Sequence, residues 1–158
     1  SDLAKYLVSL LSDTIPQFLL PALIFLLGSI ISFATGTAYG TMGILMPLTI
    51  PLASSMSSDP KFVIMSIGAV LTGAIFGDHC SPISDTTILS SMGAGCDHLD
   101  HTKTQIWYAI FVAMFAVIFG YIPVGLNVPV YIVLPVDVII LGALVYLIGK
   151  PVEVKESK

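Results

Sequence analysis

The sequence has 158 residues, of which 56% are hydrophobic and only 10% are charged. Soluble domains carry about a quarter charged residues, so this composition excludes an ordinary soluble globule and predicts an all-α membrane protein. The formal net charge of -4 comes without a basic patch, and nothing points to nucleic acid as a partner. We therefore expect one transmembrane domain over 1–158, with the lipid bilayer as its surroundings.

The first predicted element is an amphipathic helix over 1–14, because Leu3, Leu7, Leu10 and Leu11 fall at helical spacing. Such a helix suits a membrane surface. The sequence shows neither an initiator methionine nor a signal-peptide pattern, and we expect it to begin within a longer protein.

Residues 17–54 are apolar apart from the stretch SFATGTAYGT. As one helix they would be roughly 55 Å long, too long for one crossing of a ~30 Å core and too short for two comfortable ones. We expect an interruption near 34–38 that makes a re-entrant hairpin or a span joined to a half-helix, with Pro47 and Pro51 bending or ending the second arm. The residues expected to support this break are Ser32, Thr35, Gly36, Thr37 and Thr41.

Residues 61–94 combine a span with a second broken or re-entrant segment. The apolar run ends in GDHCSPISDTT, where Pro82 cannot continue the incoming helix. Ser81 and Asp85 suit the cap and the first turn of a new short helix. Pro82 also lacks the amide that would bond to the carbonyl of Asp78, so we expect that oxygen to be free.

The rest of the chain reads as a polar loop at 95–104, spans at 105–123 and 129–149, and a solvated tail at 150–158. An antiparallel pair of spans puts the loop and the tail on the same side. Together they carry four lysines, and the turn between the spans carries none, so we expect the loop side to be cytoplasmic. These lysines are Lys103, Lys150, Lys155 and Lys158.

The polar stretch concentrates carboxylate, hydroxyl and carbonyl oxygens, the ligands that a hard cation such as Na+ prefers, at membrane depth. A carboxylate withdrawn from water can hold a proton near neutral pH, and a second carboxylate nearby strengthens this. If Na+ and H+ compete for the same oxygens, exchange of one for the other follows. The candidate cation- and proton-binding residues are Asp78, His79, Ser81, Ser84, Asp85, Thr86 and Thr87, with Pro82 supporting the break.

Other interpretations stay open. Either aspartate could merely cap a half-helix, and His79 could tune Asp78 or bond a carbonyl. Cys96, His98 and His101 could suggest zinc, but a polar loop is favoured over a metal site, and both cysteines read as free thiols. Asp137 in the last span could face the bundle interior. An intramembrane aspartyl protease using a pair of carboxylates is a remote alternative, as is a subunit without transport activity.

Two stretches carry a family resemblance. SFATGTAYGTMGILMPLTIPLA and GDHCSPISDTTILSSMGAGCDHLDHTKTQ resemble the signature regions in the C-terminal half of the NhaC-type Na+/H+ antiporter family, from about Pro16 to the span after Lys103. The resemblance implies a multi-pass secondary transporter of the ion transporter superfamily, in a bacterial plasma membrane, with inverted repeats and broken helices. Tyr39 and Trp107 depart from the family pattern, in which Trp and Pro are common at these places.

The resemblance implies Na+/H+ exchange rather than enzyme activity. The alternative is a Na+- or H+-coupled carrier of a small organic anion, of the malate or lactate type, or of an amino acid. An inverted-repeat transporter needs a second half, so we expect an N-terminal half or a partner chain, and a homo-oligomer is open. We expect no cofactor, and no metal beyond the transported Na+.

Overall fold

The computed structural model describes residues 16–149 and, within that range, contains helices and short connections but no strand. This confirms the all-α prediction. The amphipathic helix expected at 1–14 and the tail at 150–158 lie outside the described residues. The elements are η1 (Gln17–Leu19), α2 (Leu20–Thr35), α3 (Ala38–Met56), α4 (Pro60–Cys80), α5 (Asp85–Ala94), α6 (His98–Phe115), η2 (Ala116–Tyr121), α7 (Ile122–Gly125) and α8 (Val130–Ile148).

Four helical stretches within the described part of the chain are long and apolar enough to cross a membrane. Together with the helical fold, they identify an integral membrane protein. The stretches are Gln17–Thr35, Pro60–Cys80, His98–Gly125 and Val130–Ile148. The 19-residue helix α3 has a comparable length but falls outside this set.

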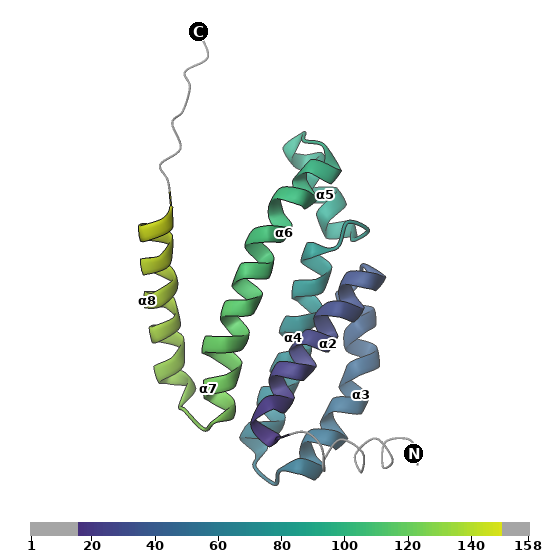
Figure 1. The fold of residues 1–158 in the computed structure, drawn as a ribbon. Coiled ribbons are helices and arrows are strands. Elements are labelled where there is room, and N and C mark those ends of the chain that lie inside the picture. The colour runs from purple at the N-terminus through teal and green to yellow at the C-terminus, as the bar shows by residue number, and fades with distance from the viewer. Residues whose placement is uncertain (1–15, 150–158) are drawn as a thin grey trace.

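Helices α2 and α3 run in opposite directions and form a hairpin whose turn is Gly36 and Thr37 (Figure 1). This turn lies inside the interruption expected at 34–38. Pro47 and Pro51 do not end the second arm, because α3 continues to Met56. Both prolines are exposed, whereas the residues buried on α3 recur at a spacing of four and hold the helix against the bundle. These residues are Thr41, Leu45, Thr49 and Ala53.

The closest helix crossing joins α2 and α4 through two glycines spaced four apart. A Cβ on Gly73 would lie 2.4 Å from the backbone oxygen of Phe25, and one on Gly77 would lie 2.2 Å from that of Ser29. Small residues at this spacing let helices approach closely within a membrane, where hydrophobicity alone does not drive association. Ser32 adds a bond across the crossing, since its Oγ donates to the backbone oxygen of Ala74 at 2.6 Å. The crossing therefore fixes the C-terminal halves of both helices relative to each other.

The polar loop expected at 95–104 is largely helical. Helix α5 ends at Gly95, which adopts a left-handed φ of 63°, and α6 begins directly after Asp97. The Asp97 carboxylate accepts the amides of Leu99 and Asp100, each at 3.0 Å, so it caps the new helix. The connection is therefore Gly95 to Asp97, and the following span starts at His98 rather than at 105.

The span that begins with α6 passes through a π-helical segment, η2, before the short helix α7. Chain direction then reverses, and α8 runs back beside this span, in contact with η2 and α7 (Figure 1). Large hydrophobic side chains along α6 and α8 are exposed. Such an apolar surface suits lipid or further helices.

Candidate functional site

The two helix breaks meet at one end of the bundle. Gly36, between α2 and α3, has a left-handed φ of 67°, and a Cβ there would lie 2.9 Å from Cγ1 of Ile83 and 3.0 Å from its backbone oxygen. Both the φ value and the close approach require glycine. Ser81, after α4, donates its hydroxyl to the backbone oxygen of Phe33 at 2.8 Å. The segments that sequence reasoning singled out separately thus form one structural unit.

Asp78 lies in the last turn of α4 and faces the second break. Its Oδ1 accepts the hydroxyl of Ser84 at 2.7 Å, and its Oδ2 accepts the hydroxyl of Thr86 at 3.3 Å. The Ser84 and Thr86 hydroxyls are themselves 2.8 Å apart. Asp78 is half-buried and Ser84 is fully buried. One carboxylate and two hydroxyls therefore converge where the backbone is no longer helical.

Asp85 has a different environment. It occupies the first turn of α5 and is exposed, and within residues 16–149 its side chain makes no hydrogen bond. An acidic residue in a first turn stabilises a helix through the helix dipole. The structure thus brings Asp78 together with Ser84 and Thr86, while Asp85 takes no part in these hydrogen bonds.

The other hydroxyls expected at the site donate to backbone oxygens. These bonds satisfy backbone carbonyl oxygens near the breaks, so their first effect is to hold the backbone in place. Thr37 caps α3 by accepting the Gly40 amide at 3.4 Å. The donors and acceptors are Ser32 to Ala74 at 2.6 Å, Thr35 to Ile31 at 2.8 Å, Thr41 to Thr37 at 2.9 Å and Thr87 to His79 at 3.2 Å.

Two details of the second break differ from the sequence-based expectation. The carbonyl of Asp78 is not free, because the Ser81 amide donates to it at 3.1 Å in a tightened last turn. The cap of α5 is Ser84 rather than Ser81, since the Ser84 hydroxyl accepts the Thr86 amide at 3.2 Å. Ser84 therefore both caps a helix and donates to the Asp78 carboxylate.

Sequence reasoning missed two residues of α6 that contact this break. The Nε2 of His98 lies 2.6 Å from the carbonyl oxygen of Pro82, and its Nδ1 lies 3.1 Å from the Ser91 hydroxyl. Gln105 donates to the backbone oxygen of His79 at 3.1 Å and also contacts the His79 ring. The sequence alone suggests His98 only as a metal ligand. Among the described residues, no group of His, Cys, Asp or Glu is arranged to hold a metal.

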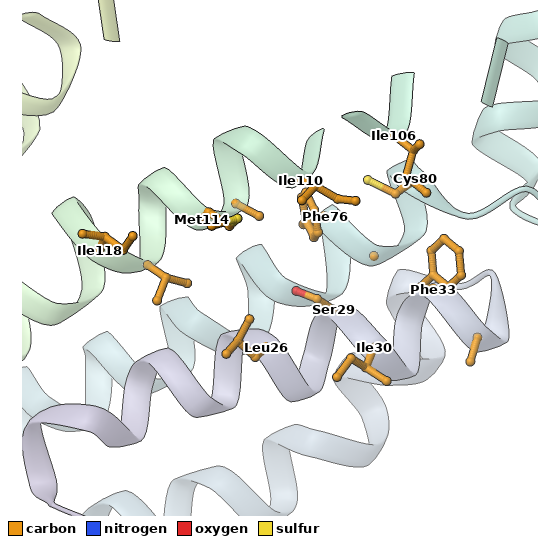
Figure 2. A pocket seen from close by; sticks show the side chains of 14 residues that line it. Leu26, Ser29, Ile30, Phe33, Phe76, Cys80, Ile106, Ile110, Met114 and Ile118 are labelled. Atoms are coloured by element: carbon orange, nitrogen blue, oxygen red, sulfur yellow. The ribbon is translucent and has the colours of Figure 1, made fainter. Parts of the chain in front are cut away.

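A groove of about 650 Å³ lies between α2, α4, α6 and η2, and Asp78 is not part of its lining. Figure 2 shows its lining, in which Ile30, Phe33 and Ile110 extend into an apolar space. The Ser29 hydroxyl on its wall already donates its proton to the Phe25 carbonyl at 2.7 Å. The groove reaches Cys80, a buried free thiol, beside the second break. It therefore offers mainly apolar surface, with one hydroxyl oxygen rather than the several oxygens that an ion needs.

A family model described as the Na+/H+ antiporter family matches residues 1–126. The chain is also similar to several curated proteins. It is 50% identical over 121 residues to an uncharacterized protein of Haemophilus influenzae, a match that covers 77% of this chain and 23% of that protein. It is 36% identical over 116 residues to the malate-2H+/Na+-lactate antiporter of Bacillus subtilis, covering 70% and 24%.

A third relative is the Na+/H+ antiporter NhaC of Alkalihalophilus pseudofirmus, 33% identical over 81 residues, which amount to 51% of this chain and 17% of that protein. The chain thus spans less than a quarter of the length of these relatives. No solved structure matches it significantly.

Proposed function

The chain belongs to the Na+/H+ antiporter family, and we propose that it forms the ion-binding part of a secondary transporter that exchanges Na+ for H+. The observation that carries this proposal is the cluster of Asp78, Ser84 and Thr86 at the meeting point of two helix breaks. Broken helices that meet within a membrane commonly form the ion sites of secondary transporters.

In the proposed mechanism, Na+ and H+ compete for the Asp78 carboxylate. The hydroxyls of Ser84 and Thr86 donate to the carboxylate at 2.7 and 3.3 Å. When Na+ binds, the same hydroxyls can rotate and offer lone pairs, because a hydroxyl oxygen is both donor and acceptor. When Asp78 is protonated, its negative charge is lost and the cation is released. One carboxylate thus suffices for exchange.

The other candidate residues have two proposed roles. We propose that Asp85, exposed at the start of α5, provides a second carboxylate for cations and protons approaching the cluster. Ser81 and Thr87 fix the backbone around the site, since each donates to a carbonyl of the break region. His79 contacts Gln105 on α6, and we propose that it aligns the last turn of α4.

The test is Na+-dependent proton flux through the full-length protein in vesicles. Asp78→Asn is expected to abolish exchange, and Asp85→Asn to weaken it. The control is Asp100→Asn. Like Asp85, Asp100 is an exposed acidic residue in the first turn of a helix, but it pairs with Lys103 at 3.6 Å rather than lying beside the Asp78 cluster. Wild-type exchange in Asp78→Asn would refute the assignment.

A second candidate function is coupled transport of an organic anion. The relative named as a malate-2H+/Na+-lactate antiporter favours it, as does the start of α3 and α5 at the two breaks, because helix N-termini attract carboxylates. The sequence contains no arginine, and Lys103 on α6 pairs with Asp100 at 3.6 Å, which favours simple cation exchange. Flux with Na+ alone, and then with malate, lactate or amino acids added, distinguishes the two functions.

We also propose a bacterial plasma membrane as the location and a multi-chain or multi-half assembly as the working form. The first proposal is supported by the bacterial relatives. The second is supported by the short span of the chain relative to them and by the exposed apolar surface on α6 and α8. The partner would be an N-terminal half of the transporter, a separate chain or a second copy. No cofactor or nucleic acid enters the proposal.

A further inference from the structure

Asp137 lies within the last membrane span, away from the two breaks. It is the eighth residue of α8, so it sits about 10 Å along a helix of 19 residues, at about 1.5 Å per residue. The side chain is half-buried, and the region matched by the family model ends at residue 126, before α8 begins. Ionisable residues at such a depth are rare, costly and mostly functional.

The carboxyl group of Asp137 faces a cavity of about 300 Å³ between α8, the preceding span and Met65 of α4. An added Cβ on Gly120 would lie 3.7 Å from its Oδ2, so the carboxyl group packs on η2 where that segment lacks a side chain. The π-helical segment Ala116–Tyr121 forms this wall, and π-helical turns concentrate at functional sites. A polar group, a cavity and an irregular helix therefore coincide at one point.

The groups around the cavity leave Asp137 without a donor. Tyr121 is the one other titratable residue in the described lining, and no base contributes to it. The Thr72 hydroxyl donates to the Gly68 carbonyl at 2.8 Å and also contacts the Tyr121 hydroxyl. Since the proton of Thr72 is already used, Tyr121 must donate to Thr72 and cannot donate to Asp137.

A Na+ ion needs several oxygens, whereas this cavity is lined mainly by Val, Leu, Ala and Met side chains. A proton needs only the carboxylate. We propose that Asp137, the π-helical segment and the cavity between them form an intramembrane proton-binding site, separate from the Asp78 cluster. This inference does not depend on Na+/H+ exchange at Asp78.

Protonation at this site would control how α8 packs. With a proton bound, Asp137 is neutral and α8 can rest on η2 through apolar contacts. With the proton lost, a charge faces an apolar cavity and must draw in water or move α8 away, because an unpaired charge is poorly tolerated there. The few contacts that α8 makes with the rest of the described chain, through η2 and α7, make such a shift feasible.

The test is labelling of the full-length protein in liposomes with dicyclohexylcarbodiimide, an apolar reagent that adds to protonated carboxyl groups. Peptide mass spectrometry locates the label. We expect labelling of Asp137 at about pH 6 that falls several-fold by about pH 9, with no label on the exposed Asp100. Asp78→Asn must leave the Asp137 label unchanged, which keeps this test independent of the cation site.

Infrared difference spectra between the same two pH values give a second readout. In the Asp78→Asn background, a carbonyl band of a protonated acid should be present and should be lost when Asp137→Asn is added. The proposal is overturned if Asp137 takes no label at acidic pH, as an aspartate paired with a base from elsewhere in the protein would behave. Labelling that does not change with pH would also overturn it.

Discussion

Gly77→Ala tests whether the α2–α4 crossing holds the two breaks together. The added Cβ would lie 2.2 Å from the Ser29 backbone oxygen and 2.8 Å from the Phe33 amide nitrogen. Because both neighbours are backbone atoms, relief requires the helices to separate. Separation weakens the Ser32 and Ser81 hydrogen bonds across the crossing, each typically about 0.6 kcal/mol in membranes.

Overpacking of a closely packed core typically costs about 1–3 kcal/mol. Together with the weakened hydrogen bonds, we expect Gly77→Ala to lower the free energy of unfolding by roughly 2–4 kcal/mol. The matched control is Gly68→Ala, on the same helix, where an added Cβ meets nothing within 4 Å. There the better helix propensity of alanine should raise stability by up to about 1 kcal/mol.

The assay is thermal unfolding of the full-length protein purified in detergent. We expect the Tm of Gly77→Ala to fall by a few degrees and that of Gly68→Ala to stay or rise slightly. Equal Tm values for the two variants would refute the close approach of α2 and α4. A lower Tm with wild-type Na+ affinity would instead refute the claim that the crossing positions the ion site.

Three further variants test the second break. His98→Ala removes the 2.6 Å bond to the Pro82 carbonyl and should destabilise the connection between α4 and α5 by about 1–2 kcal/mol. The measurement is amide hydrogen exchange at Ser84, which should become faster. Unchanged exchange would count against a positioning role for His98. Ser84→Ala removes both the cap of α5 and the closer donor to Asp78, and should raise the apparent KM for Na+ about 5–10-fold. Thr86→Val, at 3.3 Å from the carboxylate, should have the smaller effect, and the reverse order in flux assays would contradict the geometry.

Local features of the fold were readable from the sequence because they depend on single residue types. Gly36 and its neighbouring hydroxyls indicated the first break, and Pro82 indicated the second. The start of α6 was not readable in the same way, because Asp97 is one of several polar residues in CDHLDH and only its bonds to two amides identify it as a cap. Polarity alone therefore suggested a longer loop.

The meeting of the two breaks could not be derived from the sequence. It depends on contacts between residues more than 40 positions apart, such as the bond from Ser32 to Ala74. Gly73 and Gly77 permit that approach, but a pair of glycines does not state which helix they face. The same limit applies to His98, whose partner Pro82 lies on another element. Sequence reasoning thus singled out the candidate residues, whereas their arrangement depends on tertiary contacts.

The most direct test of the central claim is proton release on Na+ binding. The full-length protein in weakly buffered detergent solution is mixed with Na+, and released protons are measured with a pH indicator dye, with choline as the control cation. Competition at Asp78 predicts that Na+ releases protons from wild type and from Asp137→Asn but not from Asp78→Asn. Equal release from Asp78→Asn and wild type would contradict the account.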